Sequence, residues 1–194
     1  MIDALNVKLA DSKAPKNITA LAILLEDPED PLLPAASSAA ESIASSKPSN
    51  ADGLVPNSSG PPNDSAGPRQ KFDLILSHLV LHHIPELQPL LATMYGCLKP
   101  GGHIALTDFE DFGPEARAFH PEAKMAGVER DGIDAKWFAG LVEDAGFVDV
   151  SVKPAWSMDK EVERFPGEWG QKKPEGGGLK TMEFPFLLCT ARRP

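Results

Sequence analysis

Three histidines of this 194-residue chain could take part in chemistry, because they lie close together in the sequence. They are His78, His82 and His83. An imidazole ring can accept a proton near neutral pH and can also bind a metal ion. A metal site is not predicted, because His78 and His82 would share a face only on a helix and no cysteine or carboxylate stands at ligand spacing nearby. We expect His82 and His83 to pack and to form hydrogen bonds under the helix that follows them.

A general base for proton transfer has three candidates, namely His78, His120 and Asp108, and the sequence selects none of them, so the catalytic residue is unassigned. Ser77 and His78 are candidates for binding a ligand. They stand at the end of an apolar run that predicts a strand, and open α/β sheets bind their ligands at the carboxyl ends of strands. We therefore expect Ser77 and His78 to line a ligand pocket.

One strand–helix–strand unit must position these residues. The runs 72–77 and 103–108 predict strands, and leucines at three- and four-residue spacing predict a helix from about 86 or 89 to 97. The Lys-Pro-Gly-Gly sequence at 99–102 ends this helix, because glycine accepts the positive φ of a helix exit and proline blocks continuation. A helical crossover between neighbouring strands makes them parallel, with a right-handed connection.

Further elements are predicted after this unit. Asp134 can cap a helix that runs to Ala145. The alternating residues 147–152 predict a strand, and the polar, glycine- and lysine-rich residues 154–182 predict a loop. The last strand is predicted over 184–191, and its apolar character places it in the interior of the sheet.

The chain before residue 71 is predicted to have two parts. In residues 1–34, apolar spacing favours a helix over 1–13, and a continuous apolar run favours a buried strand over 18–25. Residues 35–70 are rich in Ser, Ala, Pro, Gly and Asn, and they cannot bury enough surface to offset their ordering entropy. We expect a disordered surface insertion there, and an ordered domain over 71–194.

Composition narrows the class of protein. With 28 acidic and 19 basic residues the formal net charge is −9, which argues against binding to nucleic acid or to an anionic membrane. The two cysteines are too few for a disulfide framework and indicate buried thiols in a reducing compartment. No signal peptide and no run of roughly 20 apolar residues is present, so a cytoplasmic protein is expected.

Three segments resemble a known family. Residues 72–77, 81–84 and 98–108 read FDLILS, LHHI and LKPGGHIALTD, and they resemble the second half of class I S-adenosylmethionine-dependent methyltransferases with a type 11/12-like domain. The resemblance covers the chain except 35–70. It implies an α/β fold, a Rossmann-like doubly wound sheet that is mostly parallel with an antiparallel last strand, in the strand order 3-2-1-4-5-7-6.

The resemblance implies a function in which a methyl group passes from S-adenosyl-L-methionine to a small molecule by in-line attack on the sulfonium carbon. It places Ser77 and His78 beside the sulfonium and the acceptor, and it makes Asp27 a ligand of the adenine amino group. In relatives, the residue after this acid often donates its backbone N–H to adenine. Here that residue is Pro28, which has no backbone N–H. No catalytic residue is carried over, since positioning and loss of water do most of the work in many such enzymes.

The resemblance also implies an N-terminally truncated domain that lacks the first two strands. Met1-Ile2 resembles the pair that opens the helix after the family's second strand, so the glycine-rich loop and an acidic ribose ligand would precede residue 1. Glycine is needed in that loop because the cofactor approaches the backbone too closely for a side chain. We therefore expect this fragment to bind S-adenosylhomocysteine no tighter than millimolar.

Two other classes of function compete with this interpretation. A non-catalytic remnant that acts as an interaction or regulatory module agrees with the missing glycine-rich loop and with the Ser/Pro-rich residues 35–70. A different Rossmann-like enzyme, such as a dehydrogenase, is disfavoured because the sequence has no dinucleotide fingerprint. The methyl acceptor, the methylated atom and the oligomeric state are open.

Overall fold

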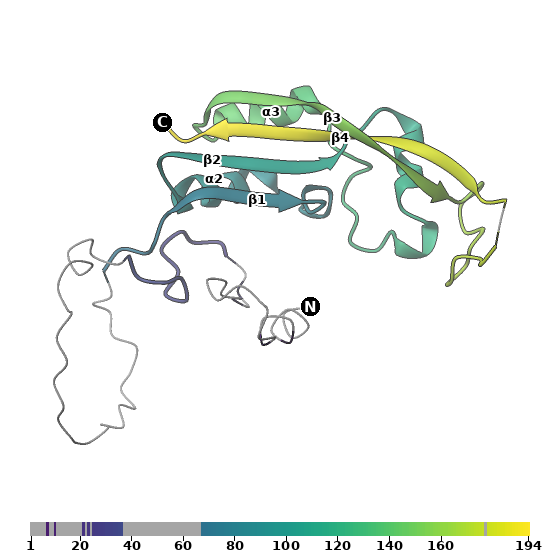
Figure 1. Ribbon diagram of the computed structural model, residues 1–194, viewed down its shortest axis with the longest axis horizontal. Helices are drawn as coiled ribbons and strands as arrows, with labels where there is room; N and C mark the ends of the chain where they lie inside the picture. The colour runs from purple at the N-terminus through teal and green to yellow at the C-terminus, as the bar shows by residue number, and fades with distance from the viewer. Residues whose placement is uncertain are drawn as a thin grey trace, which may run out of the picture. The chain divides into compact units, whose positions relative to one another are not determined.

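The computed structural model describes nearly all of the chain from residue 67 onward and a short stretch before it. The described residues are 7, 10, 21, 23, 25–36, 67–176 and 178–194. The chain divides into two compact units, residues 1–70 and 71–194, and each is considered by itself. Figure 1 shows the second unit as a sheet with helices packed against it.

A four-stranded sheet forms the centre of the second unit (Figure 1). Its strands are β1 (Phe72–His78), β2 (Leu98–Phe109), β3 (Val148–Val162) and β4 (Lys180–Arg192), in the order β1-β2-β4-β3. β1 and β2 are parallel, whereas β4 runs antiparallel to both of its neighbours. The predicted α/β fold class is therefore confirmed, because this order and these directions are those of the last four strands of a Rossmann-like methyltransferase sheet.

The helix α2 (Leu87–Cys97) makes the crossover between β1 and β2, within the predicted range. Glycine is required in the turn that follows: Gly101 has a φ of +78°, and a Cβ atom on Gly102 would lie 3.0 Å from the carbonyl oxygen of Phe72. A side chain at Gly102 would therefore push β2 away from β1. Because the turn already lies against Phe72, β2 begins before His103, its predicted start.

The helix α3 (Ala135–Asp144) begins at the predicted cap. The carboxylate of Asp134 accepts the backbone N–H of Trp137 at 2.6 Å, which satisfies one of the donors that the first turn leaves open. The helix stops just before Ala145, and Gly146 follows with a φ of +94°. Among the described residues, no helix is long and apolar enough to cross a membrane.

The prediction of a polar loop over 154–182 is wrong at both ends. β3 continues to Val162 and β4 begins at Lys180, so the two strands form one long hairpin. Polar residues such as Asp159 and Glu161 are tolerated within β3 because it is an edge strand. The part of β3 near Val162 has side chains that are exposed to water. Polar composition therefore did not mark the end of the strand.

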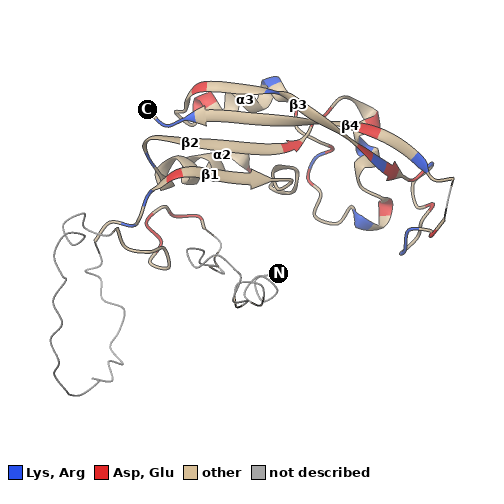
Figure 2. Cartoon of the chain, in the orientation of Figure 1, with Lys and Arg blue, Asp and Glu red and all other residues tan. Residues whose placement is uncertain are grey.

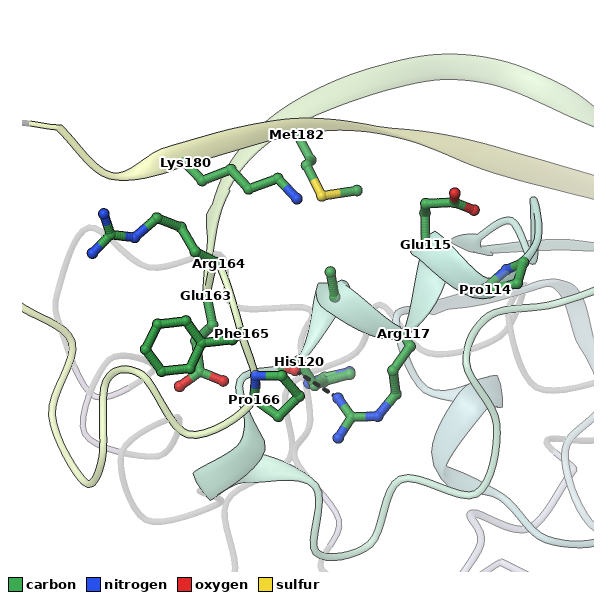
Figure 3. A pocket seen from close by; sticks show the side chains of 11 residues that line it. Pro114, Glu115, Arg117, His120, Glu163, Arg164, Phe165, Pro166, Lys180 and Met182 are labelled. Atoms are coloured by element: carbon green, nitrogen blue, oxygen red, sulfur yellow. Dashed lines mark hydrogen bonds between the residues drawn. The ribbon is translucent and has the colours of Figure 1, made fainter.

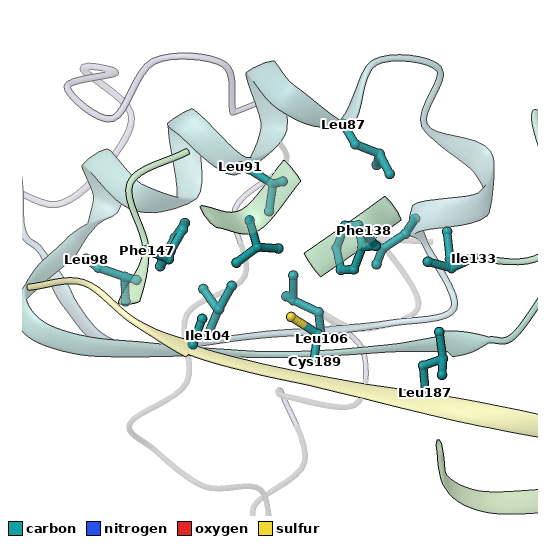
Figure 4. Close-up of a cluster of buried hydrophobic side chains, with 13 residues drawn as sticks. Leu87, Leu91, Leu98, Ile104, Leu106, Ile133, Phe138, Phe147, Leu187 and Cys189 are labelled. Atoms are coloured by element: carbon teal, nitrogen blue, oxygen red, sulfur yellow. The ribbon is translucent and has the colours of Figure 1, made fainter. Parts of the chain in front are cut away.

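Two clusters of buried apolar side chains stabilise the second unit. The larger cluster lies between the sheet and both helices (Figure 4). Its buried members are Leu81, Leu87, Leu91, Leu98, Ile104, Leu106, Ile133, Phe138, Val142, Phe147, Leu187, Cys189 and Ala191. The smaller cluster consists of Phe109, Ala116, Phe119, Val162, Phe184 and Phe186. Because α2 and α3 contribute to the same cluster, they cover the same face of the sheet.

β1 is an edge strand within the part of the chain that the structure describes. Ile75 packs against the larger cluster, whereas its neighbours Leu74 and Leu76 are 50% and 70% exposed. An apolar edge strand is a template for pairing with another strand. Because side chains alternate along a strand, Leu74 and Leu76 belong to the face opposite to Ile75, and their exposure describes that face of β1.

Neither Cys97 nor Cys189 is part of a disulfide, both side chains are buried, and burial raises the pKa of the Cys189 thiol to about 12. Because the thiolate is the reactive form, we expect iodoacetamide to leave both thiols of the folded chain unmodified at about pH 8 and to alkylate both after unfolding in guanidinium chloride. Mass spectrometry of the two samples measures this. Equal alkylation of Cys189 in folded and unfolded chains would contradict the packing.

Within the first unit, the two ends of the predicted insertion 35–70 are tied together. Ala35 and Arg69 form an antiparallel bridge, and the backbone N–H of Arg69 donates to the carboxylate of Glu29 at 2.9 Å. The described ends of this segment are therefore paired with each other, and the disordered insertion stays a prediction. Residues 37–66 lie outside the described residues.

The two elements predicted near the start of the chain are only partly described. The helix predicted over 1–13 falls almost entirely outside the described residues, as do five of the eight residues of the strand predicted over 18–25. Leu21, Ile23 and Leu25 are described and belong to no strand. Leu21 is 38% exposed, which does not suit a strand buried on both faces.

Candidate functional site

The carboxyl-terminal edge of β1 and β2 brings polar side chains together. His78 pairs with Thr107 across the two strands, and its Nδ1 atom lies 2.6 Å from the Thr107 hydroxyl oxygen. The same hydroxyl donates to the carbonyl oxygen of Ser77 at 3.4 Å. Ser77 and His78 thus lie at the edge where the sequence placed them, and their role in binding a ligand stays a prediction.

The chain leaves β1 through a strained residue. Leu79 has a φ of +53°, in the left-handed region that a leucine rarely adopts. Its backbone N–H donates to the carbonyl oxygen of Thr107 at 2.9 Å, which holds the turn against β2. The turn leads directly into a 3-10 turn, η1 (Leu81–His83). Strained residues of this kind cluster at binding sites because the surrounding structure must hold them in place.

His82 and Asp108 form a buried pair beside this edge, with side chains 2% and 1% exposed. Nδ1 of His82 lies 2.8 Å and 3.0 Å from the two carboxylate oxygens of Asp108. The carboxylate also accepts the backbone N–H groups of His82 and Phe109, at 3.1 Å and 2.9 Å. Asp108 therefore fixes both the imidazole and the turn that carries it. Packing and hydrogen bonding of His82 were predicted, but its partner was not.

His120 completes a histidine cluster with His82 and His83. The 3-10 segment η2 (Pro114–Phe119) delivers it, so that its Nε2 atom lies 3.1 Å from Nε2 of His82. One ring nitrogen from each of the three residues lies within 4.8 Å of the others. His83 also places its Nδ1 atom 2.6 Å from the carbonyl oxygen of Gly127. Sequence reasoning missed this convergence because no local pattern relates His120 to residues 38 positions away.

Arg130 fastens the turn that carries His82 and His83. Its guanidinium donates to the carbonyl oxygens of Leu81, Ile84 and Pro85 at 2.6, 2.7 and 2.8 Å. The planar fork of an arginine suits several fixed acceptors at once. The histidine cluster is therefore supported from the segment after η2 as well as from β2.

Two cavities meet at His120, which lines both. The smaller, of about 200 Å³, lies between η2 and the β3–β4 hairpin, and Figure 3 shows Arg117, Lys180 and Glu163 around it. Glu163 accepts the backbone N–H groups of Glu122, Gly167 and Trp169, and these hydrogen bonds lower the pKa of its carboxyl group. Its carboxylate therefore stays charged and holds the loop after β3 in place.

The larger cavity, of about 550 Å³, is lined by four lysines and by Glu161, which forms an ion pair with Lys173. Its lysines are Lys124, Lys160, Lys172 and Lys173. Burial, together with the charges of Lys124 and Lys173, lowers the pKa of Lys160 to about 8. Trp169 also lines it, and its buried indole N–H has no hydrogen-bond partner among the described residues. Figure 2 shows charged residues of both signs gathered at this end of the β3–β4 hairpin.

Asp27, the predicted adenine ligand, lies in the first unit. Its carboxylate accepts the backbone N–H of Glu29 at 2.8 Å, and its carbonyl oxygen accepts that of Asp30 at 3.1 Å. The side chain therefore stabilises a tight turn. Its role as a cofactor ligand stays a prediction.

Comparison with known proteins gives a family match and several relatives. Residues 9–104 match the family model described as a methyltransferase domain. Phosphoethanolamine N-methyltransferase 1 of Triticum aestivum is 32% identical over 104 residues, which are 53% of this chain and 20% of that protein. Phosphoethanolamine N-methyltransferase 2 of Caenorhabditis elegans is 26% identical over 92 residues, 47% of this chain and 21% of that protein. The chain spans about a fifth of the length of these relatives.

Solved structures of methyltransferases are also similar. A putative methyltransferase from Bacillus halodurans aligns with a TM-score of 0.45 at 19% identity, covering 64% of this chain and 65% of that one. Phosphoethanolamine N-methyltransferase 2 of Haemonchus contortus, in complex with phosphomonomethylethanolamine and S-adenosylhomocysteine, aligns with a TM-score of 0.42 at 15% identity. That alignment covers 63% of this chain and 34% of the other.

Proposed function

We propose that this chain transfers a methyl group from S-adenosylmethionine to a small molecule, because residues 9–104 belong to the class I S-adenosylmethionine-dependent methyltransferases. The observation that carries the proposal is the parallel pairing of β1 and β2, which ends at His78 and Thr107. Open α/β sheets bind ligands at that edge. In this proposal Ser77 and His78 line the sulfonium pocket, and Asp27 binds the adenine amino group.

The proposed acceptor is a small phosphorylated amine. The relatives from wheat and Caenorhabditis elegans are phosphoethanolamine N-methyltransferases. The larger cavity would suit the phosphate of such an acceptor, because Lys124 and Lys160 offer positive charge and Trp169 offers a buried N–H donor. The amine nitrogen would attack the methyl carbon in line with the departing sulfur, which requires its lone pair to be free.

His78 is the proposed acceptor of the proton that this amine loses. The carboxylate of Asp108 is buried and already accepts hydrogen bonds from His82 and Phe109. His120 directs its Nε2 atom at His82 instead of at the edge of β1. His78 is exposed at that edge, where its Nδ1 atom lies beside the Thr107 hydroxyl, so its ring is accessible to a bound acceptor.

Donor binding is proposed to be weak in the chain as it stands, since its sequence holds no glycine-rich turn between a strand and a helix. Calorimetric titration with S-adenosylhomocysteine should give a dissociation constant above ~1 mM, a binding free energy weaker than about −4 kcal/mol. A micromolar constant would refute this part of the proposal and would leave methyl transfer itself supported.

Transfer is tested with S-adenosylmethionine that carries a labelled methyl group, supplied at millimolar concentration. We expect more label in phosphoethanolamine than in ethanolamine, because only the former carries the phosphate. Lys160→Met should raise the KM for phosphoethanolamine about 10-fold, since a charge-assisted hydrogen bond contributes roughly 1.5–3 kcal/mol. Lys136→Met, an exposed lysine of α3 outside both cavities, is the matched control and should change nothing. Equal labelling of both amines would rule out the phosphorylated acceptor.

A second candidate function rests on β1, an edge strand among the described residues. Its exposed Leu74 and Leu76 side chains would suit contact with another polypeptide, as in a non-catalytic interaction module. A folded chain that transfers no label to any amine, and whose β1 resonances do not respond to S-adenosylhomocysteine, would favour this alternative over methyl transfer.

A further inference from the structure

The histidine cluster has a geometry that hydrogen bonding alone does not require. His82 is buried, His120 is half-buried and His83 is exposed, and each places one ring nitrogen within 4.8 Å of the other two. The His82 and His120 Nε2 atoms are 3.1 Å apart. Two ligands of a tetrahedral zinc ion at 2.0–2.1 Å would be about 3.3 Å apart, so this spacing is close to that of a coordination shell.

Partners behind two of the rings fix which nitrogen carries the proton. Nδ1–H of His82 donates to the Asp108 carboxylate, and Nδ1–H of His83 donates to the Gly127 carbonyl oxygen. The Nε2 atoms of His82 and His83 therefore carry lone pairs, and that of His82 accepts a hydrogen bond from Nε2 of His120, which a bound cation would displace. A histidine that binds a metal nearly always donates its other N–H to a carboxylate or a backbone carbonyl in this way.

We propose that His82, His83 and His120 form a three-histidine site for a divalent cation of the zinc class, with its fourth position open to the cavities that His120 lines. This site goes beyond methyl transfer and does not depend on it. Three histidines with an open position are a known zinc ligand set in proteins. The cation would stand between the β1–β2 edge and the larger cavity.

The surroundings include one negative charge that would balance a cation. The carboxylate of Asp108 supplies a negative charge directly behind His82. The ammonium of Lys160, which also lines the larger cavity, donates to the Phe119 carbonyl oxygen and lies 3.6 Å from the centre of that ring.

The test is a titration of the full chain, purified without a histidine tag and treated with a chelator, with Co²⁺ and then Zn²⁺. We expect one Co²⁺ per chain, with the visible absorption bands of a tetrahedral site, and stoichiometric displacement of that Co²⁺ by Zn²⁺. Octahedral cobalt spectra throughout, or no saturable binding, would overturn the proposal and show that the three rings only form hydrogen bonds.

Variants decide whether the cluster is the site. His120→Ala should weaken Zn²⁺ binding by at least 10-fold, and Asp108→Asn should weaken it by about 10–100-fold through loss of the partner behind His82. His120 is half-exposed, so its variant stays informative if the Asp108 variant does not fold. His103→Ala is the matched control, because His103 is exposed on β2 and belongs to no such group. An equal loss of Zn²⁺ affinity in His103→Ala and His120→Ala would overturn the proposal.

Discussion

Replacing Asp108 with alanine is expected to lower the free energy of unfolding by about 3–5 kcal/mol, the usual cost of removing one partner of a buried pair. The substitution leaves three buried donors without an acceptor: Nδ1–H of His82 and the backbone N–H groups of His82 and Phe109. Water cannot replace the carboxylate easily, because the side chains of both Asp108 and His82 are almost fully buried. Urea denaturation followed by circular dichroism measures the change.

Asp73→Ala is the matched control for this substitution. Asp73 also lies on a strand of the sheet, β1, and forms an ion pair with Lys99 at 2.9 Å, but its side chain is 83% exposed. An exposed pair contributes only about 0–1 kcal/mol, so the control should shift the denaturation midpoint little. A similar loss in the free energy of unfolding for both aspartate variants would contradict the placement of Asp108 in the interior.

Replacing Phe138 with alanine is expected to destabilise the second unit by about 3–5 kcal/mol. Phe138 is 1% exposed and lies in the larger cluster between α3 and the sheet (Figure 4). Its removal leaves a cavity that the surrounding side chains from two helices and two strands can fill only in part. Thermal and urea denaturation should both show the loss.

Phe165→Ala removes the same side chain from the loop after β3, where it is 61% exposed. A surface substitution of this kind usually changes the free energy of unfolding by about 0.5 kcal/mol or less. A difference of several kcal/mol between the two phenylalanine variants is therefore expected. A fully cooperative, unshifted transition for Phe138→Ala would mean that α3 does not pack on the sheet as described.

Local signals in the sequence were enough to predict the β1–α2–β2 unit. The apolar runs, the leucine spacing of α2 and the glycines of the turn are all read from neighbouring residues, and Gly102 can hold no side chain where it stands. The Asp134 cap was predicted for the same reason, since a cap is recognised within one turn of its helix. The antiparallel interior strand β4 followed from the family resemblance and its apolar composition.

Contacts between distant residues were not predictable in this way. Residues 154–162 and 180–182 look like a loop, because polar side chains are tolerated on the outer part of an edge hairpin as well as in loops. The contact of His120 with His82 depends on how η2 folds back over the sheet, and no spacing in the sequence encodes it. The same is true of the three carbonyl groups that Arg130 binds.

The binding of the methyl donor at the carboxyl-terminal edge of β1 and β2 is tested most directly by nuclear magnetic resonance on the ¹⁵N-labelled chain during titration with millimolar S-adenosylhomocysteine. The amide signals of Ser77, His78 and Leu79 should shift progressively, while that of His103, which pairs with Leu74 farther from this edge, should stay in place. Shifts confined to His103 and its neighbours, or none in β1 at any concentration reached, would contradict a donor site at this edge.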